Sequence, residues 1–221
     1  MLTLIVMTDG RREYLEQAAA TFDRLHGPIA ARVIHDDSGD PDYAAWLYSA
    51  FPGWTIVSTG ARSGFAGAYR SAWSWLRDNC RTDWVFSTED DFLFERDVDT
   101  DAMASVMLLR PMAQMALLRQ PWNRVEQVAG GIVEQHPDDY TDRTDGTHHW
   151  LQHRRFYTTN PHLTRLRFIK THDWPEGSES EGRFGVDLFA SEPMTTCGFW
   201  GPRGSGPWVR HIGAERAGTA Y

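Results

Sequence analysis

Three consecutive acidic residues, Glu89, Asp90 and Asp91, follow an apolar run in the segment VFSTEDDFLF (85–94). Acidic side chains are poor strand formers and repel one another at this spacing, so their place at the end of a buried strand needs a reason. One reason is a divalent cation, because Mg²⁺ and Mn²⁺ take one or two carboxylates together with phosphate oxygens. The other is a solvated surface turn, which needs no ligand.

The first part of the chain alternates between two kinds of periodic segment. Apolar runs predict strands over 2–7, 31–37, 54–58 and 83–87, and helical spacing of apolar residues predicts helices over 11–25, 41–51 and 65–79. This alternation predicts a parallel sheet covered by helices, in which ligands bind beyond the carboxyl ends of the strands. Polar clusters occur at those ends, over 8–11, 36–38, 60–62 and 89–91. We therefore expect a site at this edge of the sheet.

The pattern loosens after residue 95. A helix is predicted over 99–110, a strand over 113–120, a short helix over 182–190 and a last strand over 207–213. Between 121 and 180, Pro, Gly, His and Asp interrupt any long element, which predicts an irregular lobe. The length of 221 residues suits one large domain.

Several ordered segments together resemble the GT-A-fold glycosyltransferases, family 2-like enzymes that use nucleotide sugars. DWVFSTEDDFLF (83–94) resembles their metal-binding acid–x–acid motif, and their earlier nucleotide-binding segments are similar to LIVMTDGRREYL (4–15), VIHDDSG (33–39) and RSGFAGAYRSAW (62–73). CGFWG (197–201) and VRHIG (209–213) are similar to their closing elements. The resemblance implies an α/β, Rossmann-like GT-A fold with a mostly parallel central sheet flanked by helices. It also implies a nucleotide-sugar-binding half (1–95) and an acceptor-binding, catalytic half (96–221) with an irregular C-terminal lobe.

The resemblance also assigns residues to the donor and the metal. Asp91 would ligate Mn²⁺ or Mg²⁺, Glu89 would contact the ribose, the sugar or a metal-bound water, and His211 would complete the metal site. The nucleotide of a UDP-sugar, the expected donor, would be held by residues from three strand ends: Thr8, Asp9, Arg11, Asp37 and Arg62. Two alternatives stay open: an Asx turn over 36–38, and a structural role for His211.

Sugar transfer to a hydroxyl also needs a general base, for which a carboxylate is the usual choice. The segment DWPEGSESEGRF (173–184) offers four acids that we expect to have no compensating base, Asp173, Glu176, Glu179 and Glu181. In related inverting enzymes the catalytic carboxylate precedes a short helix, and the spacing of Ser180, Glu181 and Phe184 is closest to that pattern. Glu181 is therefore the first candidate and Glu179 the second. The alternative is a helix N-terminus enriched in acids because of its dipole.

Composition narrows the class of protein. The chain is 41% hydrophobic and 24% charged, as in ordinary soluble globular proteins, and its 10 tryptophans suit stacking on sugar rings or bases. The opening MLTLIV is too short for a secretory signal, and no apolar run reaches the roughly 20 residues that span a bilayer. Two cysteines are too few for a disulfide scaffold. These features favour a cytoplasmic protein without a membrane span.

A basic segment (143–172) stands out from an acidic chain of net charge -8. It contains six basic residues and one acid, against 16 basic and 29 acidic residues in the remainder. Its basic residues are Arg143, Arg154, Arg155, Arg165, Arg167 and Lys170, interleaved with Trp150, Phe156, Tyr157 and Phe168. Basic side chains among aromatic rings suit a phosphate backbone with stacked bases. A solvated basic face, or a patch that serves only the donor diphosphate, would give the same composition.

These observations predict a metal-dependent, inverting transferase that moves a sugar to an acceptor hydroxyl. Enzymes of this build occur in phages, where some glucosylate hydroxymethylated DNA bases and others modify virion proteins. A base acceptor would have to be flipped out of the duplex. Protein or glycan hydroxyls are the alternative acceptors, and a non-catalytic nucleotide-sugar or nucleic-acid binding protein is the alternative class.

Overall fold

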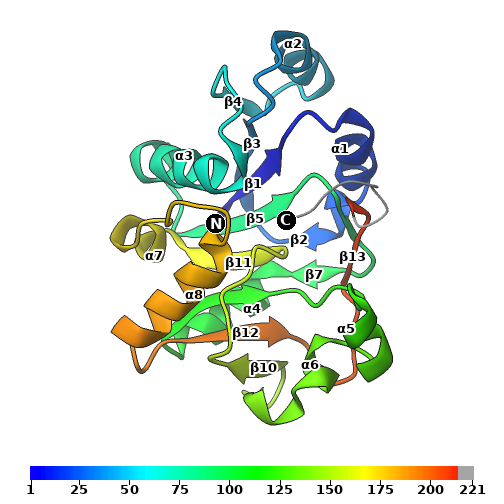
Figure 1. Ribbon diagram of the computed structural model, residues 1–221, viewed down its shortest axis with the longest axis vertical. Coiled ribbons are helices and arrows are strands. Elements are labelled where there is room, and N and C mark those ends of the chain that lie inside the picture. The colour runs from blue at the N-terminus through cyan, green and yellow to red at the C-terminus, as the bar shows by residue number, and fades with distance from the viewer. Residues whose placement is uncertain (214–221) are drawn as a thin grey trace.

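The computed structural model of the chain describes residues 1–213, which build an α/β fold around a nine-stranded sheet (Figure 1). In spatial order the strands of the sheet are β4 (Thr55–Ser58), β3 (Ile29–Asp36), β1 (Leu2–Thr8), β5 (Trp84–Glu89), β11 (His162–Arg165), β8 (Met112–Ala116), β12 (Thr196–Trp200), β10 (His149–His153) and β9 (Tyr140–Thr144). Two short pairs accompany the sheet, β13 (Val209–His211) with β6 (Phe92–Phe94), and β2 (Leu25–His26) with β7 (Val98–Asp99).

The sheet is mostly parallel. Strands β4, β3, β1 and β5 run in parallel, and β8 and β12 also pair in parallel. Strand β11 runs against both β5 and β8, and β10 runs against both β12 and β9. Because β1 lies between β3 and β5, the segments that follow these three strands meet at one edge of the sheet, as the sequence predicts.

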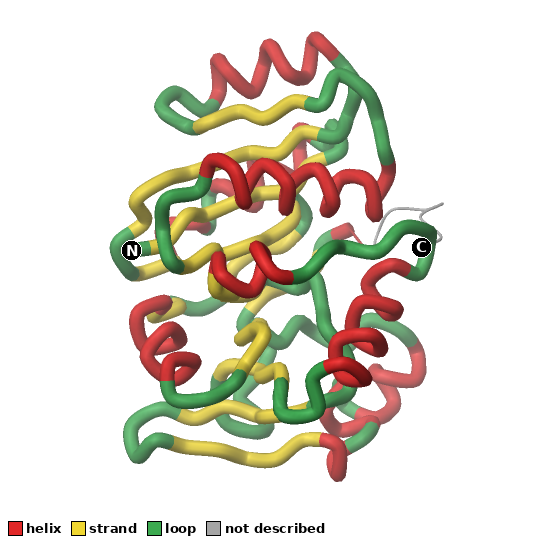
Figure 2. The backbone as a smooth tube through the Cα atoms, turned by 90° about the vertical axis from the view of Figure 1, so that its left-hand side faces the viewer, coloured by secondary structure: helices red, strands yellow, loops and turns green. Residues whose placement is uncertain are grey.

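Helices cover both faces of the sheet (Figure 2). The longer helices are α1 (Arg12–Ala19), α2 (Pro41–Ala50), α3 (Gly64–Asn79), α4 (Thr100–Leu108) and α8 (Ser180–Ser191), and the shorter ones are α5 (Arg124–Ala129), α6 (Ile132–Gln135) and α7 (Leu166–Thr171). Side chains of alternate β1 residues point to opposite faces. Leu4 and Val6 pack with α1, α2 and α4, whereas Ile5 and Met7 pack with α3, α7 and α8.

The predicted elements of the first half are present with shifted ends. The predicted helix over 11–25 is too long, because α1 ends at Ala19 and a 3₁₀ turn (Phe22–Arg24) and β2 follow it. Strand β5 extends through Glu89, the first residue of the acidic triplet. A second 3₁₀ turn spans Pro137–Asp139.

The prediction for the second half is less accurate. The predicted strands over 113–120 and 207–213 shorten to β8 and β13. The prediction of an irregular lobe over 121–180 is partly wrong, since β9, β10 and β11 belong to the central sheet. Among residues 1–213, no helix combines the length and the apolar character needed to cross a membrane.

Candidate functional site

The acidic triplet lies inside the protein where β5 turns into β6. Asp90 and Asp91 have no exposed surface, and Glu89 is 9% exposed. The backbone N–H of Asp90 donates to the carbonyl of Met7 at the end of β1, which ties the triplet to the neighbouring strand. The alternative of a solvated surface turn is therefore wrong. Three buried acids need compensation from nearby cations or ligands.

Arg11 supplies part of that compensation. Its guanidinium forms ion pairs with Asp90, with Asp91 at 2.5 Å and with Asp9 at 2.8 Å. Burial works against the charge of Arg11, but the charges of Asp90, Asp91 and Asp9 outweigh it and raise the pKa of the guanidinium above its ordinary value. Arg11 thus lies against the acidic triplet at the mouth of the site, where sequence reasoning expected it beside a diphosphate.

Asp91 also meets His211 from the far end of the chain. The Nε2 atom of His211 lies 3.1 Å from Oδ2 of Asp91. Burial alone would raise the pKa of Asp91, but hydrogen bonding to His211 and the charges of Arg11 and His211 hold it below its ordinary value. A Cβ atom on Gly213 would lie 2.2 Å from Oδ2 of Asp91, so only glycine leaves room for this pair.

The side-chain atoms of Asp91 and His211 suit a divalent cation that is also bound by a substrate. Oδ1 of Asp91 is buried and has no hydrogen-bond partner among the described residues, and a carboxylate oxygen in that state is suited to a metal. Within residues 1–213 no group of three or more His, Cys, Asp or Glu side chains has the arrangement of a complete metal site. Mg²⁺ and Mn²⁺ are commonly held by one or two carboxylates plus substrate phosphates, so the single carboxylate of Asp91, with the imidazole of His211 beside it, is compatible with such an ion.

Glu89 and Asp90 differ from Asp91 in their protonation. Burial and the neighbouring charge of Asp91 raise the pKa of Glu89 to about 8. Burial, opposed by Arg11, raises the pKa of Asp90 to about 7. The hydroxyl of Tyr69 on α3 donates to Oε1 of Glu89 at 3.1 Å. Of the three acids, Asp91 is thus the one whose surroundings most favour the ionised form.

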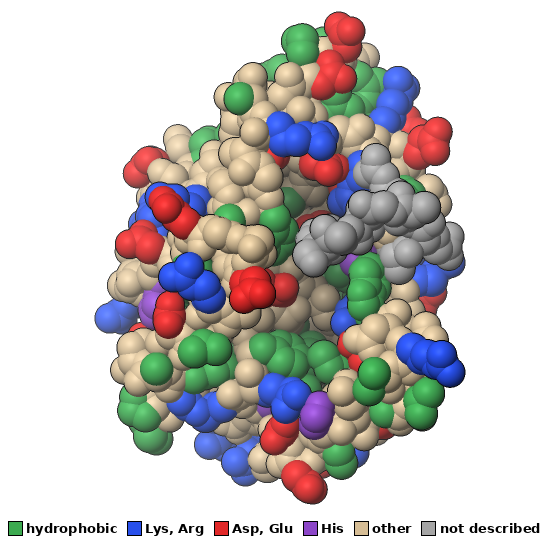
Figure 3. Space-filling model, viewed as in Figure 1, with side chains coloured by type: hydrophobic (Ala, Val, Ile, Leu, Met, Phe, Trp, Pro, Cys, Tyr) green, Lys and Arg blue, Asp and Glu red, His purple; other side chains and the backbone are tan. Residues whose placement is uncertain are grey.

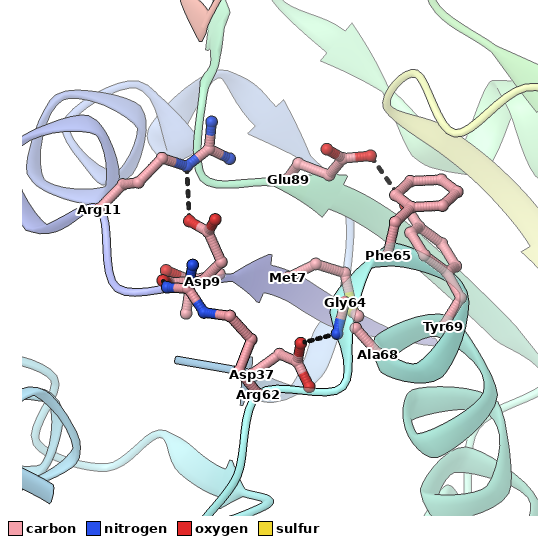
Figure 4. Close-up of a pocket in the computed structure, with 11 residues that line it drawn as sticks. Met7, Asp9, Arg11, Asp37, Arg62, Gly64, Phe65, Ala68, Tyr69 and Glu89 are labelled. Carbon is pink, nitrogen blue, oxygen red and sulfur yellow. Dashed lines mark hydrogen bonds and ion pairs between the residues drawn. The ribbon is translucent and has the colours of Figure 1, made fainter. Parts of the chain in front are cut away.

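A first cavity of about 180 Å³ opens beside the triplet (Figure 4). It is lined by Met7, Thr8, Asp9, Arg11, Asp37, Arg62, Gly64, Phe65, Ala68, Tyr69 and Glu89. All six residues assigned to the donor are therefore together, although they come from the ends of different strands or from the segments after them: Thr8, Asp9, Arg11, Asp37, Arg62 and Glu89. Arg62 spans the cavity rim and donates to the carbonyl of Asp9 at 2.5 Å.

Some of these residues also have structural partners. The carboxylate of Asp37 accepts from the backbone N–H groups of Ser63 and Gly64 at 2.8–3.0 Å, so it holds the N-terminus of α3. The hydroxyl of Thr8 donates to Asp90 at 2.7 Å. Asp36 accepts from the backbone N–H of Ser38 at 2.8 Å, which is the Asx turn that the sequence left open.

A second, larger cavity of about 680 Å³ shares Phe65 and Glu89 with the first. Figure 3 shows this face of the molecule hollowed near its centre, with acidic side chains beside the hollow. The lining includes Phe92, Arg119, Trp122, Thr158, Thr159, Asn160, Ser178, Glu179, Glu181, Gly182, Arg183, Val186, Asp187 and His211. Both candidate bases and the candidate metal histidine therefore face one space.

Of the two candidate bases, Glu181 is the one whose carboxylate is held by hydrogen bonds. Its Oε1 accepts from the backbone N–H of Thr159 at 2.6 Å and from the Thr159 hydroxyl at 3.2 Å. Its helix is anchored by Trp174, whose indole N–H donates to Ser180 at 3.1 Å and whose ring stacks on Phe184. Glu179, at the N-cap of α8, makes no capping hydrogen bond.

The other two acids of the 173–184 segment are not free. Asp173 pairs with Arg77 at 2.8 Å, and Glu176 pairs with Arg70, both from α3. The expectation that all four acids lack a compensating base is therefore wrong, because it considered only neighbours in sequence. Of the four acids, Glu179 and Glu181 line the second cavity, and Asp173 and Glu176 do not.

The basic segment is largely occupied with the protein itself. Arg154 donates to the carbonyls of Phe189, Glu192 and Thr195 at the end of α8. Arg155 pairs with Asp139. Three further residues were assigned to nucleic acid. Arg165 donates to the carbonyl of Met107, whereas Arg167 and Lys170 are exposed. None of these five lines either of the two cavities described above.

Sequence reasoning missed several residues of the site. Tyr69, Thr159 and Trp122 line the cavities, and Gly213 leaves space for Asp91. Tyr69 has helical spacing with apolar neighbours and therefore reads as a core residue. Thr159 acts through its backbone N–H, which no sequence pattern marks. Gly213 falls inside the quoted VRHIG segment, whose final glycine was the available signal.

No protein-family model and no curated protein sequence matches this chain. Several solved structures are similar to this chain. TarS from S. aureus (residues 1–349) aligns with a TM-score of 0.63 and 14% identity over 96% of this chain and 60% of that one. A complex of TarS 1–349 with UDP-GlcNAc aligns with a TM-score of 0.63 and 15% identity over 100% and 61%. The mannosyltransferase PcManGT from Pyrobaculum calidifontis, in complex with GDP-Man and Mn²⁺, aligns with a TM-score of 0.64 and 12% identity over 98% and 58%.

These alignments concern the fold. The chain spans about three fifths of the length of each of these three structures. Its large, mostly parallel central sheet flanked by helices is the α/β fold of GT-A-like glycosyltransferases, as the resemblance implied.

Proposed function

We propose that this protein is a glycosyltransferase that moves a sugar from a nucleotide diphosphate sugar, expected to be a UDP-sugar, to an acceptor hydroxyl with inversion. One observation carries the proposal. Asp91 contacts the linings of two cavities: it pairs with Arg11, which lines the cavity at the carboxyl ends of β1, β3 and β5, and with His211, which lines a second cavity that also contains the carboxylate of Glu181. Residues 1–95 would hold the donor, and residues 96–221 would provide the acceptor side and the base.

The first cavity suits the nucleotide part of the donor. Its volume of about 180 Å³ is smaller than typical cavities for whole drug-sized ligands, so a nucleotide sugar has to extend beyond it. Glu89 and Phe65 line both cavities and mark the direction in which the sugar would extend. Arg62, which is exposed on the rim, can turn toward phosphate oxygens.

Asp91 and His211 would hold Mn²⁺ or Mg²⁺ together with the diphosphate. When bound, the ion supplies positive charge that stabilises the diphosphate as it leaves. Arg11 already lies against Asp91 and Asp90, and its guanidinium offers further donors to a phosphate oxygen once a cation satisfies the carboxylates. PcManGT, whose structure contains GDP-Man and Mn²⁺, provides a parallel for the kind of ligand.

Glu181 would act as the base. The acceptor oxygen forms a bond to the anomeric carbon while the bond to the diphosphate breaks, and the hydroxyl proton passes to Glu181. Attack from the side opposite the leaving group inverts the anomeric centre. The two hydrogen bonds from Thr159 fix one carboxylate oxygen, so the other is available for the proton.

The second cavity suits an acceptor with both polar and apolar surface. Trp122, Phe65 and Val186 provide apolar contacts, and Arg183 and Asp187 provide polar ones. A protein or glycan hydroxyl is compatible with such a lining. A hydroxymethylated DNA base, as in phage DNA, has less support, because Arg154, Arg155 and Arg165 already bind protein groups.

The first experiment is a thermal-shift screen of UDP-, GDP- and TDP-sugars with and without Mn²⁺, followed by an assay of donor hydrolysis without acceptor. We expect one nucleotide class to raise the melting temperature only when Mn²⁺ is present, and slow release of free sugar. A screen in which no nucleotide sugar changes the melting temperature contradicts the proposal. Binding without hydrolysis would instead indicate a non-catalytic nucleotide-sugar binding protein.

A further inference from the structure

We propose that the segment from Arg119 to Glu126, called here the 119–126 arm, positions His211 beside Asp91, with Gln120 and Trp122 as positioning residues. The arm follows β8 and pairs with β13 through a bridge between Arg119 and Val209. This inference rests on the proposed metal role of Asp91 and His211. It adds Gln120 to the site and gives Trp122 a second role beside its proposed contact with the acceptor.

Gln120 fixes the backbone of His211. Its side-chain Nε2 donates to the carbonyl of His211 at 2.8 Å, and its Oε1 accepts from the backbone N–H of His211 at 2.9 Å. One amide side chain therefore satisfies both main-chain polar groups of a single residue. Strand β13 has only three residues, so these two bonds add substantially to what holds His211 in place.

Trp122 fixes the ring of His211. The imidazole lies between two aromatic rings. Its centroid is 4.2 Å from that of Trp122, with an interplanar angle of 14°, and 4.4 Å from that of Phe92, with an interplanar angle of 9°. A ring stacked on both faces cannot rotate about its Cβ–Cγ bond without losing both contacts. The sandwich therefore keeps Nε2 directed at Asp91.

The arm is itself anchored by buried charge. Glu126 is 4% exposed and receives two hydrogen bonds from Arg119, at 2.7 and 3.2 Å. Its Oε2 also accepts from the backbone N–H of Trp122 at 2.8 Å, and Asn123 caps the start of α5 by accepting from the N–H of Glu126. A buried ion pair is weak evidence for stability, but here it places the backbone of Trp122.

The consequence is a contribution to metal affinity from residues that do not touch the metal. Side chains that orient a metal ligand typically change affinity by about 10- to 100-fold when they are removed. Trp122→Ala deletes one side of the sandwich, and Gln120→Leu deletes both hydrogen bonds to the His211 backbone. Trp122→Phe keeps an aromatic face over the imidazole.

The test is the affinity for Mn²⁺ in the presence of UDP, measured from the electron paramagnetic resonance signal of free Mn²⁺. We expect Trp122→Ala and Gln120→Leu to weaken Mn²⁺ binding about tenfold or more, and Trp122→Phe to restore it to within about threefold of the unmodified protein. Trp46→Ala is the matched control, because it removes a partly buried indole that packs against Tyr43 and Phe51 in another part of the fold. Thermal unfolding of each variant accompanies the titration.

Asp91→Asn and His211→Ala in the same assay separate the two proposals. If neither changes Mn²⁺ affinity, the metal site is wrong and both proposals fall. If both weaken binding while Trp122→Ala and Gln120→Leu do not, the positioning role alone is wrong. Equal losses in Trp122→Phe and Trp122→Ala, or in Trp46→Ala, would trace the effect to general destabilisation and also overturn the inference.

Discussion

The hydroxyl of Tyr69 donates to Oε1 of Glu89 at 3.1 Å. Glu181, the proposed base on α8, is held separately by the backbone N–H of Thr159 at 2.6 Å. Tyr69 thus orients the acid at the end of β5 that lines both cavities. Burial and the charges of Glu89 and Glu181 raise the pKa of Tyr69 well above its ordinary value, which keeps the hydroxyl protonated as a donor.

Tyr69→Phe should therefore lower sugar transfer by about tenfold, the effect of losing one hydrogen bond of about 1.4 kcal/mol. Steady-state kinetics with a saturating donor would measure the loss. Tyr140→Phe is the matched control, since Tyr140 is buried and its hydroxyl has no hydrogen-bond partner among residues 1–213. Equal activity of the Tyr69 variant and the unmodified protein would rule out a contribution of this hydrogen bond.

Glu181→Gln should retain donor binding but reduce transfer by roughly 100-fold or more, the scale of a lost general base. Gln keeps the size of the side chain and can still accept the hydrogen bonds from Thr159, so the fold should persist. Glu179→Gln should have a smaller effect. A large loss in Glu179→Gln together with normal turnover of Glu181→Gln would move the catalytic role to Glu179.

Gly213→Ala should disrupt the Asp91–His211 pair with little loss of overall stability. The added methyl group would lie 2.2 Å from Oδ2 of Asp91 and 3.1 Å from Nε2 of His211, so one of the two must move. We expect Mn²⁺ affinity to fall about tenfold or more while the melting temperature changes by a few degrees. Gly206→Ala is a useful comparison, because its added Cβ would make only ordinary contacts with Leu118, at 3.5 and 3.7 Å. Unchanged Mn²⁺ binding in Gly213→Ala would contradict the steric argument.

The half of the site that follows strands was predictable, and the half that depends on long-range packing was not. Asp9, Asp37 and Glu89 come together because parallel strands end at one edge, a rule that can be applied to sequence alone. His211 was proposed as a metal ligand from the order of motifs, and the structure brings it to Asp91. The indole of Trp122 and the amide of Gln120 reach His211 through tertiary contacts that leave no periodicity in sequence. Likewise, the pairing of Asp173 with Arg77 is invisible until α3 and the 173–184 segment pack together.

Two buried histidines predict an acid-sensitive fold. Burial lowers the pKa of His162 to about 4, and burial with the charge of Arg155 lowers that of His153 to about 3. The unfolded chain, with ordinary histidine pKa values near 6.5, binds these protons first, so stability is present above about pH 6.5 and is lost as the pH falls toward 4. His162 alone should cost about 2 kcal/mol of unfolding free energy between pH 7.5 and pH 5.

Urea denaturation at pH 7.5 and pH 5 would measure this difference. His162→Gln should reduce the pH dependence, because Gln does not titrate and can still bond to the Asn160 carbonyl or the Tyr157 hydroxyl. Identical pH profiles for His162→Gln and the unmodified protein would show that His162 is not the group responsible.

Arg154 decides between a structural and a nucleic-acid role for the basic segment. Because its guanidinium donates to the carbonyls of Phe189 and Glu192 at the end of α8, Arg154→Ala should destabilise the protein by about 1 kcal/mol. Arg167→Ala, at an exposed position, should change stability by less than about 0.5 kcal/mol.

A nucleic-acid role predicts a different result. If four arginines of the segment contact phosphates, a plot of log affinity for hydroxymethylcytosine duplex DNA against log salt concentration should have a slope of about -3.6. Each Arg→Ala substitution should flatten that slope by roughly one. We expect weak DNA retention with no such slope, measured by filter binding at several salt concentrations. A steep slope that Arg154→Ala flattens without loss of stability would restore nucleic acid as the acceptor.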